Sequence, residues 1–278
     1  LVGSEMCIRD RGVKGSNHHI VVKEYFKKEV SLMECLSFDS LVDSLIEGYS
    51  DIGIMALENT IAGSIIPNYA LIDKHNLHII GEYYLNIHHH LMGLGNQGLS
   101  DIDEVFSHPM ALLQCKDFFK KHKHIKLVED SDTANVAKRI SENKLKNIAA
   151  IAPKIAAEIY DLKVIEDEIQ TIKNNSTRFV IIQSQKSVIK NNLINKATIK
   201  FQLNHKRGSL AAILNVLSDC KLSLTKIQSL PVIEMPWKYA FFVDITFEEL
   251  KNYEKAKSII TIMAEDFKVL GTYINGRK

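Results

Sequence analysis

The chain has 278 residues, 46% of them apolar, which is enough for a large globular domain with a second, smaller one. Lysine plus arginine (35) nearly balances aspartate plus glutamate (33), and the formal net charge is +2. No basic block is dense enough for nucleic acid, and no apolar run reaches the roughly 18 residues of a membrane span. We therefore expect neither nucleic-acid nor membrane partners.

Residues 1–11 (LVGSEMCIRDR) lack the apolar run that should precede the glycine turn at Gly12, and they do not look like a signal peptide. They resemble translated sequencing-adapter sequence. This interpretation predicts that residues 1–11 are non-native and that the native first strand is missing.

From Gly12 to about Gln185, short β-like runs alternate with helical stretches. The predicted strands cover 51–57, 78–84, 103–107, 125–128, 148–152 and 179–182. This alternation indicates an α/β fold with largely parallel strands. Three residues mark helix starts after these strands: Ser107 ahead of Pro109, Asp132, and Pro153.

The loops that leave the strands are rich in small hydroxyl, amide and glycine residues. They cover 12–16, 58–64, 107–109 and 131–133. In open parallel sheets such loops line the ligand crevice, and helix N-termini there attract anions. The pattern suits a cleft for a small anion without metal or cofactor, although helix capping alone explains roughly half of these residues.

The segment Asn174–Phe179 is a polar turn that runs directly into the apolar strand 180–182. Arg178 offers a planar fork that matches a carboxylate, and Thr177 supplies one adjustable donor. A polar turn before a buried strand is also ordinary. Together with the loops above, however, it predicts a site for a carboxylate-bearing substrate.

Cysteine and histidine do not indicate a metal site. Four cysteines are scattered without a CxxC pair, and they are Cys7, Cys35, Cys115 and Cys220. We predict reduced thiols in a cytoplasmic protein. The runs 18–19 and 88–90 contain adjacent histidines, but neighbouring strand residues point to opposite faces and no third ligand has a convincing spacing. We predict structural or solvent roles for these histidines.

After a polar stretch at 184–195, the pattern changes to strand, helix, strand, strand, helix, strand. The predicted elements cover 198–203, 209–219, 223–230, 239–246, 250–266 and 267–273. This βαββαβ order is the ferredoxin-like arrangement. A second domain is therefore expected to begin near residue 197.

From Gly12 onward the chain resembles the prephenate dehydratases, because six motifs occur in the order of that family. They are Gly12-x-x-Gly15-Ser16, Glu58-Asn59-Thr60-x-x-Gly63-Ser64, Ser107-His108-Pro109-Met110-Ala111-Leu112-x-Gln114-Cys115, Asp132-Thr133-Ala134, Ala149–Ala152 with Ala156–Leu162, and Asn175-x-Thr177-Arg178-Phe179. The resemblance implies a two-lobed catalytic domain at 12–185, like a periplasmic solute-binding protein. Lobe 1 would cover about 12–90 plus 175–185, lobe 2 about 91–174, and Thr177 would lie at the hinge.

The resemblance also implies a function. The chain would be a carbon-oxygen lyase that converts prephenate to phenylpyruvate in L-phenylalanine biosynthesis, without a cofactor. Thr177 would donate the proton to the leaving hydroxyl, and Arg178 would bind a carboxylate. Further substrate contacts are expected from Glu58, Asn59, Thr60, Gly63, Ser64, His108, Thr133, Ala134 and Phe179. For His108 a structural role at the helix start is at least as plausible as an acid role.

Residues 197–275 resemble the ACT regulatory domain, which implies inhibition by L-phenylalanine and a homodimer or homotetramer. Effector contacts are expected from Asn204, Gly208, Ser209, Leu210, Gln228 and Ser229. Gln228 and Leu230 stand where the family has a glutamate and an arginine, so the effector region lacks two charges.

Three other functions fit parts of this pattern. An arogenate or cyclohexadienyl dehydratase differs only in accepting an amino group in place of the side-chain ketone. A solute-binding protein shares the lobes, but the βαββαβ tail argues against it. A non-catalytic amino-acid sensor would be expected to have an altered Thr-Arg-Phe motif, and here that motif is intact.

Overall fold

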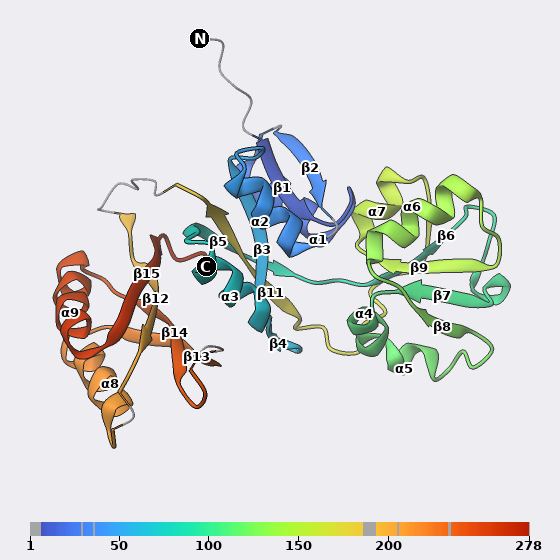
Figure 1. The fold of residues 1–278 in the computed structure, drawn as a ribbon. Coiled ribbons are helices and arrows are strands. Elements are labelled where there is room, and N and C mark those ends of the chain that lie inside the picture. Colours follow the sequence, from blue (N-terminus) through green and yellow to red (C-terminus); the bar gives the residue numbers. More distant parts are fainter. Residues whose placement is uncertain are drawn as a thin grey trace, which may run out of the picture. The chain divides into compact units, whose positions relative to one another are not determined.

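The computed structural model describes residues 7–28, 30–35, 37–185, 193–204, 206–232 and 235–277 (Figure 1). Contacts divide the chain into two units. One contains residues 1–63 and 84–179, and the other contains residues 64–83 and 180–278. The polar stretch predicted at 184–195 falls in the second unit, and its residues 186–192 lie outside the described residues.

The first sheet has the strand order β2-β1-β3-β11-β5, with β4 beside β3. Its strands are β1 (Cys7–Arg11), β2 (Ser31–Cys35), β3 (Ile52–Asn59), β4 (Gly63–Ser64), β5 (His78–Asn86) and β11 (Ser176–Gln183). The helices that follow its strands are α1 (Asn17–Phe26), α2 (Phe38–Ile46) and α3 (Ile66–Lys74). Strand β1 pairs in parallel with both β2 and β3.

A strand that was not among the predicted ones precedes Gly12. Residues Cys7–Arg11 form β1, which lies between two neighbours and has Ile8 fully buried. Its sequence, CIRDR, contains no apolar run, so the apolar pattern did not predict it.

The second sheet has the order β10-β6-β9-β7-β8. Its strands are β6 (His90–Gly93), β7 (Glu104–Ser107), β8 (Lys126–Glu129), β9 (Ile148–Ala152) and β10 (Lys163–Glu166). Its helices are η1 (Leu99–Asp101), α4 (Pro109–Gln114), α5 (Lys116–Phe119), α6 (Thr133–Asn143) and α7 (Lys154–Ile159). Strand β7 is parallel to β8 and β9, whereas β6 runs antiparallel to β9 and β10. The α/β prediction is confirmed. Strand β6 runs against the other four strands of this sheet, and neither β6 nor β10 was among the predicted strands.

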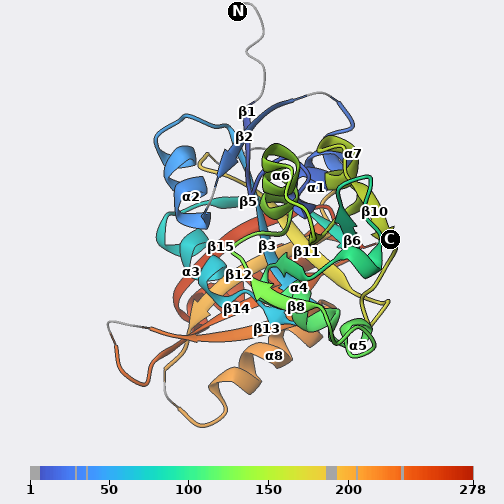
Figure 2. The same cartoon turned by 90° about the vertical axis from the view of Figure 1, so that its right-hand side faces the viewer.

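The third sheet has the order β13-β14-β12-β15, and all its neighbours are antiparallel. Its elements are β12 (Lys196–Gln202), α8 (Ser209–Asp219), β13 (Ser223–Pro231), β14 (Tyr239–Thr246), α9 (Leu250–Met263) and β15 (Glu265–Tyr273). Helices α8 and α9 cover one face of this sheet (Figure 1, Figure 2) and share one apolar core with it. The ferredoxin-like prediction is confirmed.

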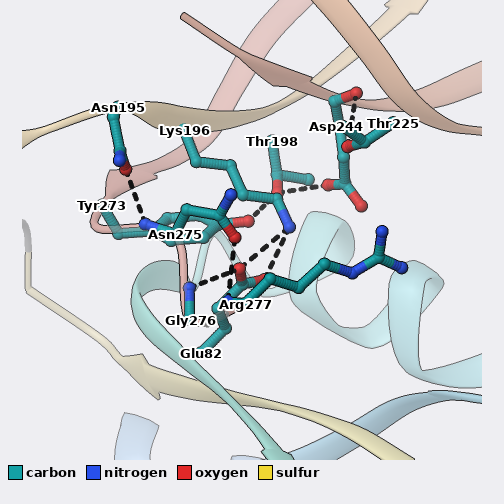
Figure 3. A network of polar contacts seen from close by, with 10 residues as sticks. All are labelled: Glu82, Asn195, Lys196, Thr198, Thr225, Asp244, Tyr273, Asn275, Gly276 and Arg277. Atoms are coloured by element: carbon teal, nitrogen blue, oxygen red, sulfur yellow. Dashed lines mark hydrogen bonds and ion pairs between the residues drawn. The ribbon is translucent and has the colours of Figure 1, made fainter. Parts of the chain in front are cut away.

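A buried ionic cluster joins β5 to the third sheet within the second unit (Figure 3). Lys196 Nζ lies 2.9 Å from both carboxylate oxygens of Glu82, and the two side chains are only 3% and 0% exposed. The backbone N–H of Gly276 also donates to Glu82 Oε1, at 2.9 Å. Glycine is required here, because a Cβ on Gly276 would lie 2.6 Å from the carbonyl oxygen of Glu82.

A second part of the same cluster lies on β12. Thr198 Oγ1 donates to Asp244 Oδ1 at 2.6 Å and lies 2.6 Å from Tyr273 Oη. Since the threonine proton goes to the carboxylate, the Tyr273 hydroxyl donates to Thr198.

In the described part of the chain, no helix combines the length and apolar character that crossing a bilayer requires.

Candidate active site

Thr177 and Asn59 meet where β11 begins and β3 ends. Asn59 Nδ2 lies 2.9 Å from Thr177 Oγ1 and 2.6 Å from Asn175 Oδ1. Asn59 Oδ1 accepts from the backbone N–H groups of Ile61 and Ala62, at 3.0 and 2.9 Å. One asparagine side chain therefore both shapes the loop after β3 and contacts the hydroxyl that the sequence assigns to catalysis.

Thr60 fixes the same loop to β11. Its backbone N–H donates to the carbonyl of Ser176, and its Oγ1 accepts from the Ser176 N–H, both at 2.9 Å. The predicted residues Asn59, Thr60 and Thr177 are thus brought together, although more than 110 residues separate the two parts of the chain.

Three residues outside the predicted site complete this polar cluster: Gln114, Asn175 and His89. Asn175 Nδ2 lies 2.9 Å from Gln114 Oε1, and His89 Nε2 lies 2.8 Å from the same oxygen. Gln114 and Asn175 stand inside the motifs that carry the family resemblance, which was the available signal. His89 had no such signal, because its histidine run suggested only structural or solvent roles.

The histidine run binds the segment that returns from β10 toward β11. The backbone N–H of Ile169 donates to the carbonyl of His89 at 2.8 Å, and the His89 N–H donates to Gln170 Oε1 at 2.9 Å. His90 Nδ1 lies 2.9 Å from Asp167 Oδ1. Among the described residues, no group of three or more histidine, cysteine, aspartate or glutamate side chains could hold a metal ion.

Burial lowers the pKa of His89, and the neighbouring His90 and His88 lower it further, against a raising effect of the hydrogen bond with Gln114. The ring is therefore neutral at physiological pH. A neutral imidazole has one donor and one acceptor nitrogen, and its neighbours decide which is which.

A cavity of about 290 Å³ borders this cluster. It is lined by Ile61, Met110, Leu113, Gln114, Lys116, Asp117, Thr171 and Ile172. Gln114 thus connects the hydrogen-bonded cluster to a space lined by four apolar residues and by the polar or charged Gln114, Lys116, Asp117 and Thr171.

The glycine loop packs against the starts of α6 and α7. A Cβ on Gly12 would lie 3.3 Å from Asp132 Oδ2, and one on Gly15 would lie 3.0 Å from Ala156 Cα. Asp132 caps α6 by accepting from the Asn135 N–H at 2.8 Å. The predicted residues Thr133 and Ala134 form the first turn of that helix, and Ala134 is fully buried.

Helix α4 begins at Pro109, as predicted, but Ser107 ahead of it is not its N-cap. His108 is the N-cap, since its Nδ1 accepts from the Met110 N–H at 3.2 Å. Ser107 instead donates from Oγ to the carbonyl of Ile151, at 2.7 Å and fully buried. Pairing of Ser107 within β7 leaves the capping position to the next residue.

Arg178 and Phe179 follow Thr177 on β11, and all three are buried. Adjacent strand residues point to opposite faces, so Arg178 faces away from the side that Thr177 and Phe179 share. The Phe179 ring meets His18 edge-on, with centroids 4.9 Å apart. Phe179 therefore packs the strand against α1.

The other predicted substrate contacts lie around β4. Glu58 is half-buried near the end of β3, and Gly63 adopts a left-handed conformation with φ +82°. Ser64 belongs to the second unit, where its Oγ accepts from Lys226 Nζ at 2.8 Å.

The predicted effector residues divide between a cavity and a strand. Asn204, Ser209 and Leu210 line a cavity of about 510 Å³ at the start of α8, and Gly208 is the N-cap of that helix with φ +81°. Gln228 and Ser229 lie on β13 and are not among the described residues that line it. Trp237, Lys238 and Glu265, which are not among the predicted effector residues, also line it, together with Leu203, Lys206, Pro236, Tyr239 and Phe241.

Comparison with known proteins agrees with this arrangement. The family model described as prephenate dehydratase matches residues 8–187. The bifunctional chorismate mutase/prephenate dehydratase of Buchnera aphidicola (subsp. Acyrthosiphon pisum) is 32% identical over 271 residues, which cover 94% of this chain and 69% of that protein. Arogenate dehydratase/prephenate dehydratase 2 of Arabidopsis thaliana is 31% identical over 283 residues, which cover 98% of this chain and 73% of that protein.

A solved structure shares the fold of the whole chain. The prephenate dehydratase from Arthrobacter aurescens, crystallised in complex with L-Phe, has a TM-score of 0.88 at 21% identity and covers 98% of this chain and 90% of that one. The matched family model covers more than half of the residues. The chain therefore belongs to the prephenate dehydratase family.

Proposed function

We propose that the chain catalyses the decarboxylating dehydration of prephenate to phenylpyruvate in L-phenylalanine biosynthesis. Prephenate carries two carboxylates and a ring hydroxyl, and loss of carbon dioxide and water makes the ring aromatic. The observation that carries the proposal is the contact of 2.9 Å between Asn59 Nδ2 and Thr177 Oγ1. In this contact the buried Thr177 hydroxyl oxygen accepts a hydrogen bond from Asn59, so the hydroxyl proton of Thr177 remains available for the substrate.

The reaction needs a proton on its leaving group. The bond between the ring and its carboxylate breaks, its electron pair moves into the ring, and the ring hydroxyl departs with the Thr177 proton as water. The Thr177 oxygen gains negative charge in this step, and the N–H of Asn59 stabilises that charge. Solvent then returns a proton to Thr177.

Arg178 binds a substrate carboxylate in this proposal. Its guanidinium is permanently charged and fits a carboxylate in two hydrogen bonds. Because strand residues alternate, its guanidinium leaves β11 on the face opposite to Thr177. Glu58, Gly63, Ser64, His108, Thr133 and Ala134 remain proposed contacts.

Thr177→Ala tests the assignment against Thr177→Ser, which keeps a hydroxyl. Loss of a proton donor should lower kcat roughly 10²- to 10⁴-fold. Phenylpyruvate formation from prephenate measures it, with arogenate as the second substrate. We expect the Ser variant to retain most turnover; equal kcat in the Ala variant and the parent would refute the role of Thr177. A preference for arogenate would place the chain with the arogenate dehydratases.

L-phenylalanine is the proposed effector. The cavity at the start of α8 contains three of the expected contacts, Asn204, Ser209 and Leu210, beside the aromatic side chains of Trp237, Tyr239 and Phe241. An effector lowers activity only if it binds the two states of the enzyme with different affinity. Calorimetry without a phenylalanine signal, together with unchanged activity at millimolar phenylalanine, would remove this part of the proposal.

The proposed assembly is a homodimer or homotetramer in the cytoplasm. Strand β13 is an edge strand of the third sheet, and its exposed side chains include Leu224 and Ile227. Unpaired edges favour association with a second copy. Light scattering after size exclusion should give at least twice the mass of the chain, and a monomer at micromolar concentration would contradict the proposal.

A further inference from the structure

The polar cluster behind Thr177 is one continuous chain of hydrogen bonds that runs from Asn59 through Asn175 and Gln114 to His89. Three of its members are buried, with Asn175 0% exposed, His89 4% and Asn59 9%, whereas Gln114 is half-buried and lines the cavity. In such surroundings a hydrogen bond that is reversed or lost is costly, so the direction of each bond matters.

Backbone groups fix the first direction. The N–H groups of Ile61 and Ala62 can only donate, so the Asn59 side-chain atom that faces them must be the oxygen. The Asn59 nitrogen therefore faces the other way, toward Asn175 Oδ1 at 2.6 Å, Thr177 Oγ1 at 2.9 Å and the Ser176 carbonyl at a longer 3.3 Å. The orientation of this amide does not depend on an arbitrary choice between nitrogen and oxygen.

Each later direction follows from the one before it. Asn175 must present its oxygen to Asn59, so its nitrogen faces Gln114 at 2.9 Å. Gln114 must then present its oxygen, which also lies 2.8 Å from His89 Nε2. An oxygen that already accepts from an amide can only accept again, so His89 Nε2 carries a proton.

The other ring nitrogen of His89 is left without a proton. His89 Nδ1 is buried and has no hydrogen-bond partner among the described residues. A proton there would be a buried donor without an acceptor. Two backbone amides in the loop after β3 thus decide the tautomer of a histidine on the crossover before β6.

We propose that His89, as its neutral Nε2–H tautomer, is a positioning residue for the reaction at Thr177. It holds the Gln114 oxygen, which keeps the Asn175 amide directed toward Asn59. The Asn59 N–H then stays on Thr177 Oγ1, and the threonine proton stays available for the substrate. This inference rests on the proposed dehydratase activity.

The tautomer can be measured without turnover. The full chain, labelled with ¹⁵N on its 11 histidines, gives two-bond proton–nitrogen correlations that separate the two neutral tautomers from the charged ring. The His89 signals are those that disappear in His89→Gln. We expect the Nε2–H pattern, and an Nδ1–H or doubly protonated ring would overturn the proposal.

Two variants of similar size separate positioning from packing. In His89→Gln the amide nitrogen can replace the Nε2–H donor, whereas His89→Met fills the space without a donor. We expect kcat to fall about tenfold in the Met variant, with KM within about twofold, and to stay within about threefold of the parent in the Gln variant. Equal kcat in the two variants would overturn the positioning role.

A double-mutant cycle tests the route. If His89 acts through Asn175, His89→Met has little further effect on kcat in an Asn175→Ala background, whereas independent residues give multiplied losses. Multiplied losses would therefore contradict the proposed route. If the parent protein lacks dehydratase activity, the proposed function fails, but the tautomer measurement still confirms or refutes the hydrogen-bond directions.

Discussion

Two buried polar clusters in this chain differ in whether their side chains carry a charge. The cluster behind Thr177 consists of the neutral side chains Asn59, Asn175, Gln114 and His89. The cluster between β5 and the third sheet contains the ion pair of Lys196 with Glu82. Opposite charges attract each other in any relative orientation, whereas two amides form a hydrogen bond only when the N–H of one faces the carbonyl oxygen of the other.

The difference indicates what each cluster is suited to do. An ion pair of 3% and 0% exposure holds two segments together, because removing either partner leaves a charge that water cannot reach. A chain of hydrogen-bonded amides adds little net stability, but it fixes an N–H donor, rather than a carbonyl oxygen, next to the Thr177 hydroxyl oxygen. We infer that the ionic cluster mainly anchors and that the neutral cluster mainly orients.

The largest expected effect is the loss of stability on breaking the ion pair. Lys196→Met leaves the Glu82 carboxylate buried without its lysine, and the free energy of unfolding should fall by about 3–5 kcal/mol. Urea unfolding measures it. The double variant Lys196→Met, Glu82→Gln removes the stranded charge and should recover much of the loss. A double variant as unstable as Lys196→Met would show that charge burial is not the cause.

The second effect is on turnover rather than stability. Asn59→Asp keeps an acceptor for Ile61 and Ala62 but replaces the donor that faces Thr177 with another oxygen. The Thr177 proton then turns toward the carboxylate, and kcat should fall roughly 100-fold. Asn143→Asp makes the same chemical change at an exposed position and should leave kcat unchanged. An active Asn59→Asp enzyme would contradict the orienting role.

The sequence predicted elements better than it predicted these clusters. Helix α8 matches the predicted range 209–219, since its start, length and apolar spacing are local features. Strand β1 was not predicted because its sequence, CIRDR, contains no apolar run, and its two neighbours are set by the fold rather than by local pattern. The contact of Asn59 with Thr177 spans 118 positions; the loop pattern grouped their segments in one site, and the family resemblance singled out the two residues. His89 stayed unassigned, because its role depends on the orientation of two distant amides.

The smallest expected effect concerns a half-exposed counterpart of the ionic cluster, Asp73 on α3. Its carboxylate oxygens lie 2.8 Å from Lys200 Nζ and 2.9 Å from Lys268 Nζ. Burial opposes ionisation of Asp73, but the hydrogen bonds from the two lysines outweigh it, and its pKa falls below the usual 3.8. A carboxyl whose pKa is lower in the folded state stabilises the protein above pH 3.8, and this contribution disappears as the pH falls through the folded value.

Asp73→Asn should therefore cost about 1 kcal/mol at neutral pH and progressively less in acid. Urea unfolding at several pH values measures the gap, with the exposed Asp219→Asn as control. A gap between parent and Asp73→Asn that stays constant into acid would mean that the carboxylate charge contributes nothing, and the contrast between an anchoring ionic cluster and an orienting neutral one would then hold only for fully buried pairs.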